Sequence, residues 1–292
     1  MQDRYTGDIG DFAKYALLRA LGEGRKLGVA WYLYPDESHN TDGKHIGYLS
    51  QPDKWRHLDP ELFDGLKALV ASGQRNVDQV ETSGLLDKGR FSNRLLAFNG
   101  NPAIRGKRRA AWFSETLSDL HHCDLVFADP DNGLCEDQKY SMASKNFWKR
   151  MPLSEAHVLA AQRTAIIYHH NTRRAGGHAR EIQYWIDQLG QQTLALYWRH
   201  LSNRTFFILR PTSEIRLRAE KFAQKWSPWF ELHTFNRNDS RKICPECGHQ
   251  FLGKGWGGID AHWKSHHEHI MPYSEAWPLI RAGCKPSRSK CN

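Results

Sequence analysis

The chain has 292 residues, and 41 Lys and Arg against 32 Asp and Glu give it a formal charge of +9 at neutral pH. A hydrophobic fraction of 40% and a charged fraction of 25% are ordinary for a folded protein and exclude a largely disordered chain. The mean hydropathy is −0.68 and no apolar run approaches the ~20 residues that cross a bilayer, so we expect a cytoplasmic protein without a membrane partner.

Hydrophobic periodicity along the first 210 residues predicts helices that alternate with buried strands. We expect helices over residues 11–21, 60–70, 110–120 and 177–189. We expect strands over residues 28–34, 77–81, 124–128, 164–170, 194–198 and 204–209. This alternation predicts an α/β sheet covered on both faces by helices. A change in composition near Ser227 and Pro228 divides the chain into a catalytic domain, 1–228, and a small module with a basic tail, 229–292.

The positive charge is concentrated in two segments. Residues 88–109 hold seven Lys and Arg and no acid, and a second basic segment lies near residues 173–174. Together with 11 Trp, 10 Tyr and 13 Phe, these segments favour a nucleic-acid partner, which we expect to be double-stranded DNA, and no obligate protein partner is evident. The alternative is a solvated basic face. The expected backbone contacts are Arg105, Lys107, Arg108, Arg109, Arg173 and Arg174.

A metal-binding pattern follows the domain boundary. Cys244 and Cys247 form a C-x2-C pair, and His262 with His266 or His267 follows after a gap of 14 residues. Two thiolates and two imidazoles at this spacing can complete a tetrahedral Zn²⁺ shell. Because four protein ligands leave no open position, we expect a structural zinc ion, with His266, four residues after His262, as the first choice for the fourth ligand.

The N-terminal segment is dense in glycine and polar residues. Gly7-Asp8-x-Gly10-Asp11 precedes Lys14-Tyr15 at the start of the first expected helix. Helix capping by Asp8 or Asp11 is one explanation. Capping requires neither the two glycines nor the lysine, so a functional site is the stronger interpretation.

This segment resembles the start of the large-subunit ribosomal RNA adenine-N6 methyltransferases of the J type, in which A-G-N, A-D and K-H follow in the same order. The resemblance extends over roughly residues 5–210. The D-P-P-Y turn of that family corresponds to Asp129-Pro130-Asp131-Asn132, and its next strand corresponds to residues 166–170. The resemblance implies a Rossmann-like class I methyltransferase-type fold, with a site at the carboxyl ends of the strands.

Two departures from that family set the functional expectation. The first strand leads into Pro35, Asp36 and Glu37 rather than into the glycine-rich turn that would admit S-adenosylmethionine. The aromatic residue that would stack on an extruded adenine is replaced by Asn132. The scaffold therefore resembles a base-flipping methyltransferase whose cofactor pocket has changed.

A cluster of carboxylates at the strand ends can stabilise an oxocarbenium-like sugar and orient water. We therefore expect a DNA glycosylase acting on a modified base, which would serve phage defence or repair. The alternatives are an adenine-N6 methyltransferase that uses S-adenosylmethionine, a metal-dependent nuclease, and a non-enzymatic binding protein. The expected catalytic residues are Asp8, Asp11, Lys14, Asp129 and Asp131. The expected substrate-binding residues are Tyr15, Asp36, Asn132, His169, His170 and Asn171.

Overall fold

The computed structural model describes residues 1–37, 43–86, 89–144, 147–235, 242–249, 251, 256–282 and 284–287. The chain divides into two compact units, residues 1–173 with 184–235, and residues 174–183 with 236–292. Its strands are β1 (Leu27–Ala30), β2 (Arg90–Ser92), β3 (Leu125–Ala128), β4 (Gly133–Cys135), β5 (Arg150–Pro152), β6 (Thr164–His170), β7 (Leu194–Trp198), β8 (Arg204–Leu209) and β9 (Phe230–His233). Its α-helices are α1 (Ile9–Gly22), α2 (Pro52–Trp55), α3 (Pro60–Ala71), α4 (Val77–Thr82), α5 (Pro102–Asp119), α6 (Leu153–Leu159), α7 (Gly177–Leu189), α8 (Ser213–Lys225), α9 (Ile259–His266) and α10 (Tyr273–Arg281).

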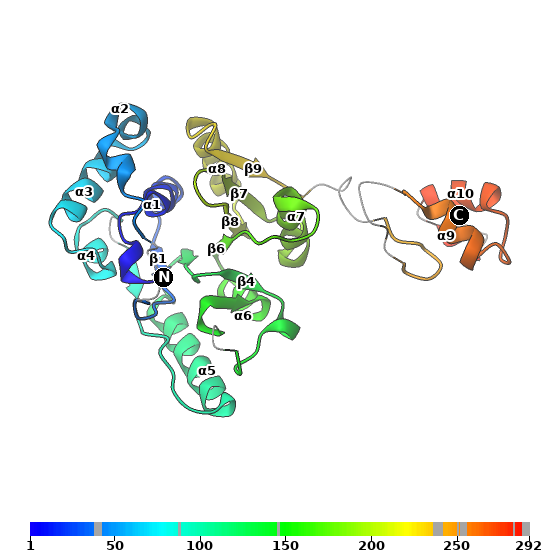
Figure 1. Ribbon diagram of the computed structural model, residues 1–292, viewed down its shortest axis with the longest axis horizontal. Helices are drawn as coiled ribbons and strands as arrows, with labels where there is room; N and C mark the ends of the chain where they lie inside the picture. Colours follow the sequence, from blue (N-terminus) through cyan, green and yellow to red (C-terminus); the bar gives the residue numbers. More distant parts are fainter. Residues whose placement is uncertain are drawn as a thin grey trace. The chain divides into compact units, whose positions relative to one another are not determined.

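A seven-stranded sheet in the order β2-β1-β3-β6-β8-β7-β9 forms the first unit (Figure 1). The pairs from β2 to β6 are parallel, whereas β8 runs antiparallel to both β6 and β7, and β9 runs antiparallel to β7. The predicted α/β class is confirmed. Because β9 pairs with β7, the predicted boundary after residue 228 comes too early, and the sheet continues to residue 233.

Helix α1 lies at the centre of one core and contacts both α3 and α8. The side chain of Asp8 accepts a hydrogen bond from the Asp11 nitrogen and caps α1. In α3, Asp59 is the cap and Pro60 occupies the first turn, as the sequence predicts. The helix that carries most of the N-terminal motif is therefore fixed at its first turn and packed along its length.

One predicted element has the wrong type. Residues 77–81 were expected to be a strand, but they belong to α4. The Asn76 side chain accepts a hydrogen bond from the Gln79 nitrogen and caps the helix. Val77 and Val80, three residues apart, both turn inward. The cap and the helical spacing outweigh the strand propensity of the two valines.

Candidate active site

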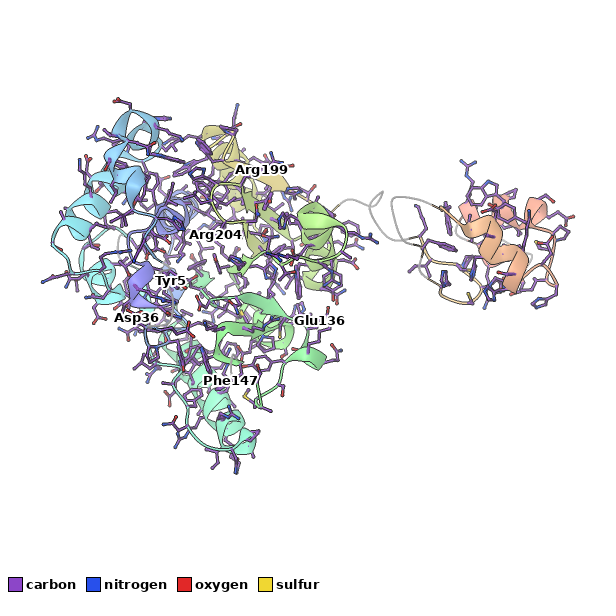
Figure 2. The ribbon with its side chains drawn as sticks, viewed as in Figure 1. Tyr5, Asp36, Glu136, Phe147, Arg199 and Arg204 are labelled. Atoms are coloured by element: carbon purple, nitrogen blue, oxygen red, sulfur yellow. The ribbon has the colours of Figure 1, made fainter. Side chains whose placement is uncertain are left out.

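A cavity of about 310 Å³ opens at the carboxyl ends of β3 and β6, next to the first turn of α1. Strand order reverses at β1, whose neighbours are β2 on one side and β3 on the other, and ligands bind at such a point in open α/β sheets. Two of the lining residues, Tyr5 and Arg204, are labelled in Figure 2. The full lining is Met1, Tyr5, Asp8, Asp11, Lys14, Glu37, Gly43, His45, Asp129, Asp131, Asn132, Lys149, Tyr168, His170, Ser202 and Arg204.

A buried lysine joins two carboxylates in the cavity wall. Lys14 Nζ donates to Asp11 Oδ1 and to Asp129 Oδ2, each at 2.7 Å. All three residues are at most 5% exposed. The second oxygen of Asp11 accepts hydrogen bonds from the Gly7 nitrogen at 3.2 Å and the Tyr15 hydroxyl at 2.9 Å. Asp11 is thus held by the protein on both oxygens, and it positions Lys14 against Asp129.

The charges of this cluster are set by burial and by its partners. Burial lowers the pKa of Lys14, but Asp11 and Asp129 outweigh burial and keep that pKa above its ordinary value. Burial and the neighbouring Asp11 carboxylate raise the pKa of Tyr15 well above its ordinary value. Lys14 therefore remains an ammonium and Tyr15 a neutral hydroxyl donor at neutral pH.

Asp8 faces the cavity from the start of α1. Its Oδ1 accepts the capping hydrogen bond from the Asp11 nitrogen at 2.9 Å, and its Oδ2 lies 3.9 Å from an Arg204 guanidinium nitrogen. Arg204 reaches this position across Gly10, where an added Cβ would lie 1.2 Å from Arg204 Nη1. The second glycine of the motif therefore makes room for the arginine.

A second charged layer lies nearer the cavity mouth. Lys149 Nζ lies 2.6 Å from Glu37 Oε2 and 3.6 Å from Asp131 Oδ2. The Gln2 amide donates to the same two carboxylates, at 3.1 and 3.2 Å. The Asn132 nitrogen donates to the Lys149 carbonyl at 2.6 Å, which ties the turn after β3 to β5. These contacts fix Asp131 and Asn132 beside the buried cluster.

Met1 lies between the ends of β1 and β3. Its nitrogen donates to the carbonyl oxygens of Tyr32 at 3.1 Å and Asp129 at 3.0 Å, and its sulfur lies 3.8 Å from Lys14 Nζ. Tyr32 has a φ of 48°, a left-handed conformation that is uncommon for a residue with a side chain. Met1 therefore fills the space between the ends of β1 and β3.

The structure brings seven of the predicted site residues to the cavity and leaves four outside its lining. Asp8, Asp11, Lys14, Asp129, Asp131, Asn132 and His170 line it. Tyr15 lies behind it and contacts Asp11. Asp36 is exposed and accepts a hydrogen bond from the Arg4 nitrogen at 3.1 Å.

His169 and Asn171 were predicted to bind substrate, but they belong to the packing. His169 is 1% exposed, accepts from the Leu134 nitrogen at 3.1 Å and packs on Trp185. Asn171 is 6% exposed, and its Oδ1 accepts from the Thr205 hydroxyl at 2.7 Å. Because side chains alternate along a strand, His170 lines the cavity while His169 points to the opposite face of the sheet.

The cavity is also lined by Tyr168, Lys149, Arg204 and His45, which were not predicted from the sequence. The alternation along β6 could have identified Tyr168, which lies two residues before His170 and shares its face. The other three come from parts of the chain that only the fold brings together.

The predicted nucleic-acid contacts differ in exposure. Lys107, Arg108 and Arg173 are exposed, and Arg105 and Arg174 are partly exposed. Arg109 is 2% exposed, and its guanidinium donates to both oxygens of Glu155 at 2.8 and 2.6 Å. The guanidinium also lies over the rings of Tyr32 and Trp112. The prediction of a backbone contact at Arg109 is therefore wrong, because α5 turns this side chain into the core.

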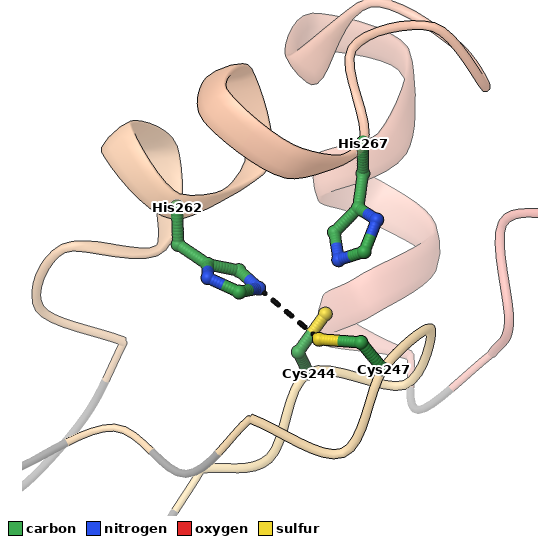
Figure 3. Close-up of side chains that lie close together, drawn as sticks. All are labelled: Cys244, Cys247, His262 and His267. Carbon is green, nitrogen blue, oxygen red and sulfur yellow. Dashed lines mark hydrogen bonds between the residues drawn. The ribbon is translucent and has the colours of Figure 1, made fainter.

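In the second unit, Cys244, Cys247, His262 and His267 lie close enough to bind a metal ion (Figure 3). Their ligand atoms are all within 4.8 Å of one another, and Cys247 Sγ lies 3.4 Å from His262 Nε2. His266 was the first choice for the fourth ligand, but His267 takes this place. Helix α9 ends at His266, and the φ of −136° at His267 carries its ring toward the cysteines.

The comparisons with known proteins place no family on this chain: no protein-family model and no curated protein matches it. Among the described residues, the helices are all too short or too polar to cross a membrane.

Proposed function

We propose that this protein is an enzyme that hydrolyses the N-glycosidic bond of an altered base in DNA. The observation that carries the proposal is the cavity at the strand ends, where Asp8, Asp11 and Asp129 are buried around Lys14. Ligand pockets span about 300–1,000 Å³, and this cavity of about 310 Å³ suits one nucleoside. A base inside a duplex reaches such a pocket by being flipped out.

The charge of the lining supports cleavage of a glycosidic bond. Five carboxylates line the cavity, against three Lys and Arg side chains. The sugar gains positive charge as this bond breaks, and carboxylates fixed in advance stabilise that charge. In our proposal the sugar C–N bond breaks, the base leaves with its electron pair, and Asp129 faces the developing cation. Water adds to the sugar carbon and gives its proton to Asp8, while the departing base takes up a proton from the solvent. Asn132 and His170 hold the extruded nucleotide.

Two observations favour hydrolysis over the alternatives. A methyltransferase must hold S-adenosylmethionine and the base together, whereas Met1 fills the space between the ends of β1 and β3. A metal-dependent nuclease would need a divalent cation between carboxylates, and Lys14 Nζ occupies the position between Asp11 and Asp129. We propose that the sheet nonetheless descends from a Rossmann-like, class I methyltransferase type, since its switch point lies at β1.

We also propose that Cys244, Cys247, His262 and His267 bind a structural Zn²⁺. The donor set of two thiolates and two imidazoles is the set that zinc prefers. Cys244 and Trp263 belong to the small core of this unit, so an ion here would hold that core together.

The test is to incubate the protein with unmodified DNA and with DNA from phages that carry modified bases, without added cofactor. Abasic sites, detected as strand breaks that require alkali or an abasic endonuclease, are the expected product. Asp129→Asn should slow their formation by at least about 10²-fold. Asp8→Asn should also slow it, and because asparagine caps helices as well as aspartate does, α1 should stay intact.

The matched control is Asp124→Asn, at the exposed amino end of β3, which should leave the rate unchanged. Strand breaks that need no alkali and stop with EDTA would overturn the proposal in favour of a nuclease. Binding of S-adenosylmethionine in calorimetry, together with the absence of abasic sites on every DNA, would overturn it in favour of methyl transfer.

A further inference from the structure

An apolar side chain stands out at the turn between β7 and β8. Leu201 is 63% exposed, more than any other large apolar residue found exposed in the described part of the chain. Its φ is 62°, in the left-handed region that is unfavourable for a residue with a side chain. A glycine or asparagine would fit this turn better, so stability does not explain the leucine.

The turn that carries Leu201 is held rigidly at both ends. On one side the Trp198 indole donates to the His200 carbonyl at 2.8 Å. On the other side the Tyr197 hydroxyl donates to Asn203 Oδ1 at 2.7 Å, and the Asn171 nitrogen donates to the Asn203 carbonyl at 3.0 Å. Asn171, which does not reach the cavity, therefore helps to fix this turn. These hydrogen bonds fix the backbone of the turn that carries Leu201.

Leu201 lies between two cavities. The next residue, Ser202, lines the candidate active site, and Leu201 itself lines a neighbouring cavity of about 370 Å³. His45 lines both cavities, so they adjoin. The neighbouring cavity is also lined by Lys44 and Lys54, whose charges suit the phosphates beside the site.

We propose that Leu201 is the wedge that enters a DNA duplex and fills the gap left by the flipped nucleotide. The inference rests on the proposed function, because it takes the candidate active site to receive that nucleotide. Proteins that deform duplexes insert apolar side chains between bases, and the inserted group compensates for lost stacking. An exposed leucine on a hydrogen-bonded turn, next to the Ser202 that lines the candidate active site, has the chemistry and the position for this role. The partner that it implies is double-stranded DNA.

The first test measures base extrusion without any chemistry. A duplex carries 2-aminopurine opposite cytosine, a weak pair, and its fluorescence rises when the base unstacks. The wild-type protein should raise the fluorescence, and Leu201→Gly should bind the same duplex without raising it. Leu201→Phe should restore the rise, because phenylalanine can also wedge between bases. Leu217→Ala, which truncates an exposed leucine of α8, is the matched control and should behave as the wild type.

The second test compares strand states. With a DNA on which the wild type forms abasic sites, Leu201→Gly should act at least about tenfold more slowly on the duplex and at the wild-type rate on the single strand. Thermal unfolding should show Leu201→Gly to be no less stable than the wild type, since glycine accepts the left-handed conformation. A misfolded variant therefore cannot account for the loss.

An unchanged fluorescence rise with Leu201→Gly, or no rise with the wild-type protein, would overturn the wedge. An equal loss of activity on both strand states would also overturn it. A wild-type protein that extrudes 2-aminopurine through Leu201 but forms no abasic site on any DNA would support the wedge and refute the glycosylase.

Discussion

The two candidate centres of this protein are built in opposite ways. The candidate metal-binding cluster takes its four residues from positions 244–267, within the small second unit. The cavity of the first unit draws on residues from Met1 to Arg204. Neighbours in the sequence suffice to form the cluster, whereas the cavity exists only after β1, β3, β6 and β8 have paired. The structure of the cluster should therefore depend on a bound ion, whereas the structure of the cavity should depend on the folding of the sheet.

The largest effect that can test this contrast is loss of the metal. Binding of Zn²⁺ to such sites contributes about 10–16 kcal/mol, more than a small unit gains from its own core. His267→Ala or chelation should unfold the second unit and leave the unfolding of the first unit unchanged. Metal analysis and thermal unfolding measure both effects.

His266→Ala is the matched control, because the neighbouring ring does not belong to the cluster. This variant should keep one zinc ion per chain. Loss of zinc from His266→Ala with retention in His267→Ala would reverse the assignment. Unfolding of the first unit together with the second would refute the separation between the two centres.

An intermediate effect on stability is expected from a comparison of Arg108 and Arg109, two adjacent arginines with different surroundings. Arg109 is buried against Glu155, while Arg108 is exposed one position earlier in α5. Removing one partner of a buried ion pair costs about 3–5 kcal/mol, so Arg109→Gln should lower the free energy of unfolding by that order. Chemical denaturation followed by circular dichroism measures the change.

Arg108→Gln should leave stability within about 0.5 kcal/mol of the wild type. Under the proposed function it should also weaken DNA binding and reduce the dependence of that binding on salt, because Arg108 is a proposed contact to a DNA phosphate. Equal free energies of unfolding for the two variants would show that the buried pair of Arg109 and Glu155 does not stabilise the protein. If DNA binding by Arg108→Gln depends on salt as it does in the wild type, Arg108 in α5 does not contact the DNA backbone.

These contrasts also explain which features the sequence could predict. Asp8 as a cap of the first helix and the turn after β3 were found because caps, glycines and strand ends are local signals, although α1 begins at Ile9, two residues before its expected start. The strand at 164–170 was found with its observed bounds, since a continuous apolar run between polar residues marks a buried strand.

The features that failed depend on distant contacts. Arg204 enters the site only because β8 lies beside β6 and because Gly10 leaves room for it. The three residues of β2 carry too little periodicity to be recognised alone, and they form a strand because β1 pairs with them. His267 was ranked below His266 because ideal helical spacing does not anticipate that α9 ends between them.

The smallest predicted effect concerns the thiols, which also differ between the two units. In the proposed zinc site, Cys244 and Cys247 must lose their protons to bind the ion at neutral pH. In the first unit, burial raises the pKa of Cys135 from 9.0 to about 11. At pH 8 only about one Cys135 in a thousand is then a thiolate, the form that reacts with alkylating reagents.

Alkylation of Cys135 in the folded protein, followed by mass spectrometry, should therefore be slow at pH 8. Because the thiolate fraction grows about tenfold per pH unit below the pKa, the rate should keep rising up to about pH 11, whereas an ordinary thiol levels off near pH 9. The same cysteine in urea is the control and should react fast at pH 8. Fast alkylation in the folded protein would show an activated thiol, and would make Cys135 a candidate nucleophile that the carboxylate chemistry of the cavity does not require.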